Sequence, residues 1–161
     1  ALYQCEGVAA VRYPRGGELY KPKDFFASDS PFDVYGDAKA PIVLVTYGRL
    51  FSYACQAKEQ LEREGISLCV LKLNQIKPVD SGALQVIRHQ QWVFFFEEGM
   101  QYGGVGEHFG YLLSRKGFSG TYYVKAVDDQ FVPQASMAQA LHHLGLDDQG
   151  MVNLIRKECK V

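Results

Sequence analysis

Two arginines near the start of the chain form the first group of residues that could bind a ligand. Arg12 and Arg15 flank a proline and follow the apolar run 7–11, which predicts a short buried strand. Ligands of α/β proteins bind at the carboxyl ends of strands, and guanidinium groups bind phosphate or carboxylate through paired hydrogen bonds. The pattern is compatible with an anion clamp, and also with arginines that are solvated or form salt bridges to another domain.

Two adjacent carboxylates come directly after a strongly apolar segment. Glu97 and Glu98 follow the run 92–96, which predicts a strand. Paired carboxylates can perform acid–base chemistry or bind metal, but neighbouring residues of a strand point to opposite faces. We therefore expect one glutamate to accept hydrogen bonds from loop or helix-terminal amides and the other to face water.

A glycine-rich loop over 103–106 precedes a predicted helix over 107–115. Free amides at the start of a helix can bind an anion. The loop lacks the G-x-G-x-x-G spacing of dinucleotide sites, however, and Glu107 would repel a phosphate. We expect the glycines to allow close packing of the helix against the sheet.

The histidines and cysteines predict no metal or redox centre. His142 and His143 are adjacent, so on a helix they point about 100° apart and cannot chelate one metal ion. None of the four cysteines belongs to a C-x-x-C pair, and Cys55 and Cys69 lie in apolar patterns that predict buried, reduced thiols. We identify no catalytic, cofactor-binding or metal-binding group in the residues alone.

The elements that would position these residues alternate along the chain. This alternation predicts an α/β fold with a mostly parallel sheet and helices on both faces. Strands are predicted over 42–47, 68–73, 92–96 and 121–127, and helices over 51–64, 81–89, 107–115, 137–144 and 150–159.

The N-terminal part does not fit this alternation. A parallel strand enters its sheet through a crossover, yet the predicted strand over 7–11 has no helix before it. We therefore expect residues 1–17 to complete a preceding domain. Residues 18–40 carry five aromatic side chains and predict an ordered connector to a main domain over 41–161.

Composition excludes several classes of protein. The 161 residues carry a formal net charge of −1, which argues against a nucleic-acid or membrane-surface partner. No apolar run approaches the roughly 20 residues of a membrane span, and the first residues lack the pattern of a signal peptide.

The order of several motifs resembles the C-terminal end of the 1-deoxy-D-xylulose-5-phosphate synthases, a family of the transketolase superfamily. The motifs are AVRYPRG at 10–16, IKPVD at 76–80, EEG at 97–99 with GGVG at 103–106, DQFVPQ at 129–134 and LGLDDQGM at 144–151.

The resemblance implies a three-layer α/β/α domain with a five-stranded mixed sheet in a cytoplasmic homodimer. It implies that two upstream domains bind thiamine diphosphate and Mg²⁺, and that the enzyme condenses pyruvate with glyceraldehyde 3-phosphate to 1-deoxy-D-xylulose 5-phosphate and CO2. Arg15 matches the family's ligand for the substrate phosphate, while Arg12 is expected to be structural. The fragment alone is expected to bind no cofactor and to be inactive.

Other origins remain open at this point. The chain could be the C-terminal domain of another transketolase-type protein, such as the β subunit of a 2-oxo acid dehydrogenase or a divergent paralogue. In that case it could act only as a non-catalytic interaction module that dimerises.

Overall fold

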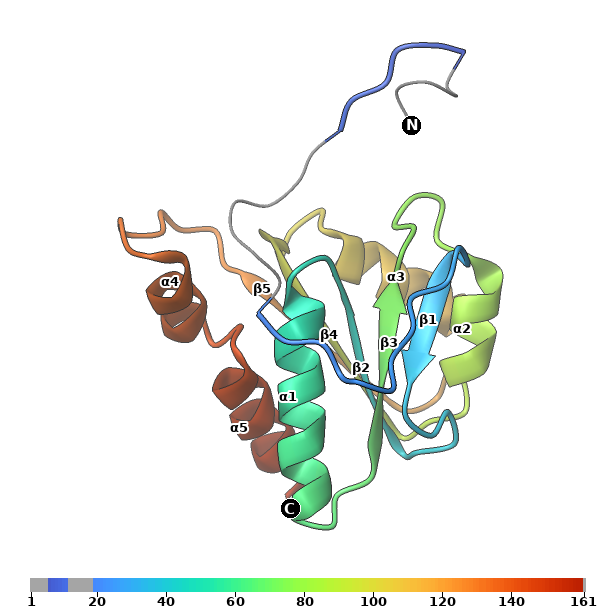
Figure 1. Ribbon diagram of the computed structural model, residues 1–161. Coiled ribbons are helices and arrows are strands. Elements are labelled where there is room, and N and C mark those ends of the chain that lie inside the picture. The colour runs from blue at the N-terminus through green and yellow to red at the C-terminus, as the bar shows by residue number, and fades with distance from the viewer. Residues whose placement is uncertain (1–5, 12–18, 161) are drawn as a thin grey trace.

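A computed structural model describes residues 6–11 and 19–160 of the chain. Strands and helices alternate along most of its length (Figure 1). The strands are β1 (Phe32–Tyr35), β2 (Ile42–Tyr47), β3 (Leu68–Leu73), β4 (Trp92–Met100) and β5 (Thr121–Val127). The helices are α1 (Leu50–Arg63), α2 (Ser81–Ile87), α3 (Val105–Arg115), α4 (Met137–Leu144) and α5 (Asp148–Cys159).

The five strands form one mixed sheet in the order β1-β3-β2-β4-β5. β1 pairs antiparallel with β3, and the other neighbouring strands are parallel. This confirms the predicted α/β class and the five-stranded mixed sheet that the family resemblance implied.

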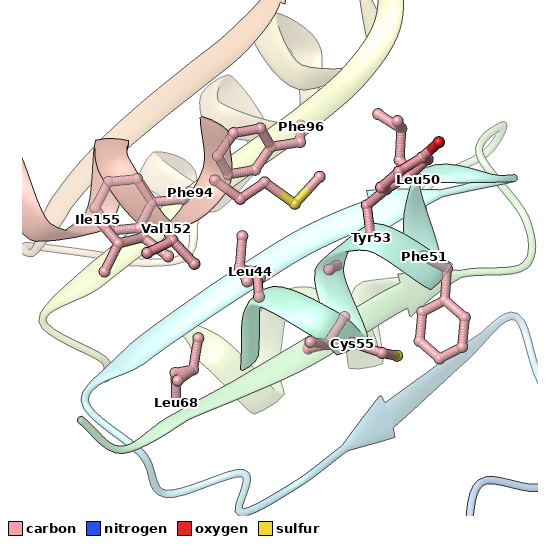
Figure 2. Close-up of a cluster of buried hydrophobic side chains, with 14 of the residues drawn as sticks. Leu44, Leu50, Phe51, Tyr53, Cys55, Leu68, Phe94, Phe96, Val152 and Ile155 are labelled. Atoms are coloured by element: carbon pink, nitrogen blue, oxygen red, sulfur yellow. The ribbon is translucent and has the colours of Figure 1, made fainter. Parts of the chain in front are cut away.

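The sheet is buried on both faces, which explains why its central strands are continuously apolar. Leu44 of β2 packs with α1 and α5, whereas Val43 and Val45 pack with α2 and α3 on the opposite face. Figure 2 shows the first of these clusters, in which Leu44 and Phe94 from the strands lie close to Val152 and Ile155 of α5. The two clusters hold the carboxyl ends of β2 and β4 in fixed positions.

Caps explain where several helices begin and end. Asp80, predicted as a capping residue, accepts a hydrogen bond from the Gly82 amide at 2.7 Å and starts α2. Gly65 was predicted to end α1, and it follows the helix with a φ of 83° that glycine adopts readily. α5 begins at Asp148, two residues earlier than predicted, because the Asp147 side chain caps it.

The segment before β2 packs against α1. Phe25 is buried, with its ring centroid 4.6 Å from that of Phe51 on α1 and 6.0 Å from that of Tyr35 in β1. Tyr20 donates a hydrogen bond to Glu59 of the same helix. The sequence did not predict β1 within this segment, because its four half-buried residues include an aspartate and do not form an apolar run.

The predicted strand over 7–11 is not formed. Residues 6–11 have no regular secondary structure, and Val8 is fully exposed. No described strand pairs with them, and a strand without a hydrogen-bonded neighbour is not stable. Whether residues 1–17 belong to a preceding domain stays a prediction. Across the described residues, no helix is long and apolar enough to cross a membrane.

Candidate functional site

The carboxyl ends of β2 and β4 define the place where an open α/β sheet usually binds its ligand. From β2 the chain crosses through α1 to β3 on one side, and from β4 it crosses through α3 to β5 on the other side. The two connections therefore leave in opposite directions, and ligands of such sheets bind at this switch point, at the carboxyl ends of the strands. In this protein Glu97 lies at the switch point.

Glu97 is almost completely buried, with an exposed fraction of 1%. Its Oε1 accepts a hydrogen bond from the Gly106 amide at 2.9 Å, and its Oε2 accepts from the Val105 amide at 3.1 Å. Both amides belong to the first turn of α3, where the helix dipole favours a negative charge. The Tyr47 hydroxyl also donates to Oε2, at 2.9 Å. Glu97 therefore occupies an anion site made by the protein's own backbone.

Side chains bridge β2 and β4 beyond the last backbone pair of the ladder, Val45 with Phe95. The Thr46 hydroxyl, which is fully buried, donates to the Phe96 carbonyl at 2.8 Å. The Tyr47–Glu97 hydrogen bond continues this connection by one residue. Hydrogen bonds of polar side chains thus join the carboxyl ends of the two strands.

Glu98 points away from Glu97, as expected for adjacent residues of a strand. Its Oε2 lies 3.2 Å from Nε of Arg49, the residue before α1, and about a third of its side chain is exposed. The two carboxylates do not share a ligand. The expectation for the pair is therefore confirmed for the buried Glu97, whereas Glu98 is only partly solvated and forms a salt bridge.

The glycine-rich loop brings α3 close to the sheet, as predicted. A Cβ on Gly106 would lie 2.8 Å from Phe95 Cδ1, and one on Gly110 would lie 2.4 Å from the Tyr122 ring. The Gly103 amide donates to the Glu107 carboxylate at 2.6 Å, so this amide is also occupied from within the protein. The loop serves packing, and its helix-terminal amides at Val105 and Gly106 are bound to Glu97.

The donors around Glu97 hold its negative charge in place, and they do not provide a second group for acid–base chemistry. Burial, and then the hydrogen bond to Glu97, raise the pKa of Tyr47 well above its ordinary value of 10.0, so the hydroxyl stays a donor at neutral pH. Burial likewise raises the pKa of Tyr122, whose hydroxyl donates to the Gly106 carbonyl at 2.6 Å. Both tyrosines stabilise the junction of sheet and helix.

The start of α3 does not fit the diphosphate of thiamine diphosphate, and no described cluster of side chains fits Mg²⁺. A diphosphate needs free loop or helix-terminal amides, and Mg²⁺ needs carboxylate oxygens. Here the amides at the start of α3 are bound to Glu97. Within residues 6–11 and 19–160, no group of three or more His, Cys, Asp or Glu side chains could hold a metal ion.

The histidine and cysteine side chains discussed above lie apart from this junction. Arg12 and Arg15 fall outside the described residues. His142 pairs with Asp147 through a 2.7 Å contact of its Nδ1. Cys55 and Cys69 are free and buried as predicted, and burial raises their pKa values to about 12 and about 11.

Sequence reasoning missed the partners of the two glutamates. Tyr47 and Arg49 are about 50 positions from Glu97 and Glu98, and no local spacing connects them. The contacts follow from the topology, because the carboxyl ends of two neighbouring parallel strands meet at one edge of the sheet. Predicting them requires the order of the strands in the sheet, which the sequence pattern did not provide.

Comparison with protein families gives a match over most of the chain. The family model described as "Transketolase, C-terminal domain" matches residues 36–151. The curated relatives include 1-deoxy-D-xylulose-5-phosphate synthase from Geobacillus thermodenitrificans, 28% identical over 91% of this chain. They also include 1-deoxy-D-xylulose-5-phosphate synthase 2 from Geobacter sulfurreducens, 30% identical over 93% of this chain. The chain spans only 24% and 25% of the length of these two relatives.

Solved structures support the same fold. A structure described as "Split gene transketolase, inactive beta4 tetramer" has a TM-score of 0.72 and 26% identity, and the match covers 88% of this chain and 46% of that chain. The transketolase of Campylobacter jejuni has a TM-score of 0.63 at 14% identity over 86% of this chain and 20% of that chain, which supports the fold alone.

Proposed function

Because the chain belongs to the transketolase C-terminal domain family, we propose that it is the C-terminal domain of a 1-deoxy-D-xylulose-5-phosphate synthase. That enzyme would join pyruvate and glyceraldehyde 3-phosphate to 1-deoxy-D-xylulose 5-phosphate with loss of CO2. The observation that carries the proposal is the match to curated synthases over 91% to 97% of this chain.

In the proposed enzyme, the chemistry belongs to domains that precede this one. Thiamine diphosphate, when bound, supplies the carbanion chemistry of such a reaction, and the amides at the start of α3 are not free for its diphosphate because two of them bind Glu97. The role of residues 41–161 is structural and dimerising, residues 18–40 connect, and residues 1–17 complete the preceding domain. The parent enzyme would be a cytoplasmic homodimer, and the fragment alone would be inactive.

Arg15 is the residue through which this chain would reach the substrate. We propose that its guanidinium binds the phosphate of glyceraldehyde 3-phosphate in the full-length enzyme. Replacing it by alanine (Arg15→Ala) should raise the KM for this aldehyde by roughly tenfold or more, the equivalent of one charged hydrogen bond. The KM for pyruvate should change little, and steady-state kinetics with each substrate varied separately would measure both.

Two further variants complete this experiment. Arg15→Lys keeps the charge and should restore part of the affinity, whereas Arg115→Ala removes an exposed arginine at the end of α3 and should change neither constant. An unchanged KM for the aldehyde in Arg15→Ala would exclude Arg15 as a phosphate ligand and favour the non-catalytic module.

A second reaction has a specific observation in its favour. The structure with a TM-score of 0.72 is described as a split-gene transketolase, so the parent protein could transfer a two-carbon unit between sugar phosphates. The two reactions differ in their donor. Release of CO2 from labelled pyruvate by the full-length protein supports the synthase, and ketose phosphate consumption without CO2 release supports the transketolase.

A further inference from the structure

A cavity of about 530 Å³ lies at the edge of the sheet, where β5, α4 and α5 come together. Figure 1 shows α4 and α5 following one another along this side of the molecule. The cavity is separate from the Glu97 junction, and none of the motif arguments above assigns it a role. Its polar lining includes Lys125, His143, Asp147, Gln149, Asn153 and Lys157.

Two lysines stand against one aspartate in this lining. Lys125 is half-buried, and its Cε passes 3.6 Å from the position that a Cβ on Gly145 would occupy, which places it over the turn between α4 and α5. No described carboxylate lies within salt-bridge distance of Lys125. Lys157 is 79% exposed, and its Nζ lies 3.4 Å from Glu158, which does not line the cavity.

Asp147, the carboxylate in the lining, has both oxygens occupied. Its Oδ1 accepts from the Gly150 amide at 2.8 Å, and its Oδ2 lies 2.7 Å from His142 Nδ1. These contacts fix the start of α5, and the carboxylate keeps its negative charge. Two lysines and one aspartate give the lining a formal net charge of +1 with the histidines neutral.

An amide group adds a neutral donor. Gln149 Nε2 donates to Asn153 Oδ1 at 2.9 Å. The side-chain carbonyl of Asn153 is therefore already hydrogen-bonded, and its NH₂ group can donate to a ligand in the cavity. Asn153 and Lys157 lie one turn apart on α5, where residues four positions apart share a face. Two lysines and an amide, from β5 and α5, thus line the same cavity.

We propose that this cavity binds the phosphate group of a small phosphorylated metabolite. A phosphate group matches a lining in which lysines outnumber carboxylates and Lys125 has no described ion-pair partner, and the volume is in the range of small-molecule sites. The inference goes beyond the proposed function, which assigns the substrate phosphate to Arg15 near a different end of the chain. It therefore stands or fails independently of the synthase assignment.

The test is an NMR titration of the ¹⁵N-labelled chain with inorganic phosphate and, in parallel, with glycerol 3-phosphate. We expect saturable shifts confined to the amides around Lys125, the α4–α5 turn and Asn153. Tighter binding of glycerol 3-phosphate would identify a metabolite site, and equal binding would identify a site for the free ion. Sodium acetate at matched ionic strength should not reproduce the shifts.

Variants connect the shifts to the residues. Lys125→Gln should weaken phosphate binding by roughly tenfold, and Lys157→Gln, on an exposed helix face, provides a second variant whose folding is not at risk. Lys116→Gln, at the end of α3, is the matched control and should bind as the parent does. Shifts spread over the surface, no saturation at tens of millimolar phosphate, or unchanged affinity in both Lys125→Gln and Lys157→Gln would overturn the proposal.

Discussion

At the scale of single residues, Glu97 is the side chain on which the junction of β4 and α3 depends. It is buried and charged, and it receives three hydrogen bonds from Tyr47, Val105 and Gly106. A buried carboxylate is stable only where donors replace the water it has lost. Helix α3 therefore starts where it does because this carboxylate binds its first amides.

Replacing Glu97 by glutamine (Glu97→Gln) should lower the stability strongly. The NH₂ group of the new side chain would face one of the helix-terminal N–H groups, so a buried donor would lose its acceptor and the helix terminus would lose its counter-charge. We expect a loss of about 2–4 kcal/mol in the free energy of unfolding, measured by urea denaturation.

The adjacent glutamate is a control within the same strand. Glu98→Gln breaks only the partly exposed contact with Arg49, so it should cost less than about 1 kcal/mol. Equal losses in the two variants would show that the hydrogen bonds of Glu97 do not stabilise the junction.

Part of this site could be predicted from the sequence. The alternation of side chains along a strand separates Glu97 from Glu98, and it correctly indicated that only one of them would meet helix-terminal amides. It could not identify Tyr47 as the third donor, because that contact depends on which strand lies beside β4. For Arg15, both its position and its role remain predictions.

At the scale of elements, helix α3 packs unusually close to the sheet. Gly106 and Gly110 are one turn apart and both face β-strand side chains, Phe95 and Tyr122 respectively. The absence of a Cβ at these positions allows the helix to approach, and it brings the Val105 amide within reach of Glu97.

Gly110→Ala tests this packing. Alanine favours a helix by about 1 kcal/mol over glycine, but here its Cβ would lie 2.4 Å from the Tyr122 ring. We expect the clash to outweigh the gain, with a net loss of about 1–3 kcal/mol in thermal or urea unfolding. Ser114→Ala, at an exposed position of the same helix, should change stability by less than about 0.5 kcal/mol, and a stabilised Gly110→Ala would contradict the packing argument.

The elements with strong periodicity were the ones that sequence reasoning identified. The strands beginning at Ile42, Leu68 and Thr121 were predicted with the observed bounds, and the apolar runs of the first two mark strands covered on both faces. β1 was missed because an edge strand of four half-buried residues has no such run. The run 7–11 has the composition of a strand, but none of the described strands pairs with it.

At the scale of the whole molecule, burial of thiols and phenols makes the fold sensitive to alkali. Burial raises the pKa of Cys55 to about 12 and that of Cys69 to about 11, from 9.0, and it also raises the pKa of Tyr47 and Tyr122 above 10.0. The unfolded chain therefore loses these protons at lower pH than the folded chain does. Their contribution is fully present below about pH 8 and is lost as the pH rises above 9.

We expect the free energy of unfolding to fall steadily between pH 9 and about pH 11, as followed by urea denaturation in buffers of equal ionic strength. Tyr122→Phe removes one of the groups and should make the decline less steep. A flat profile, or an unchanged slope in Tyr122→Phe, would show that these groups do not couple to folding.

The contacts of the segment over 19–35 also limit how this domain can move. Tyr20 donates a hydrogen bond to Glu59, Phe25 packs on Phe51, and β1 pairs with β3. The segment therefore contacts the rest of the domain at three places. It cannot act as a hinge without breaking at least one of them. Residues 20–35 will therefore turn together with the sheet and α1, as one piece, relative to any unit attached ahead of Leu19.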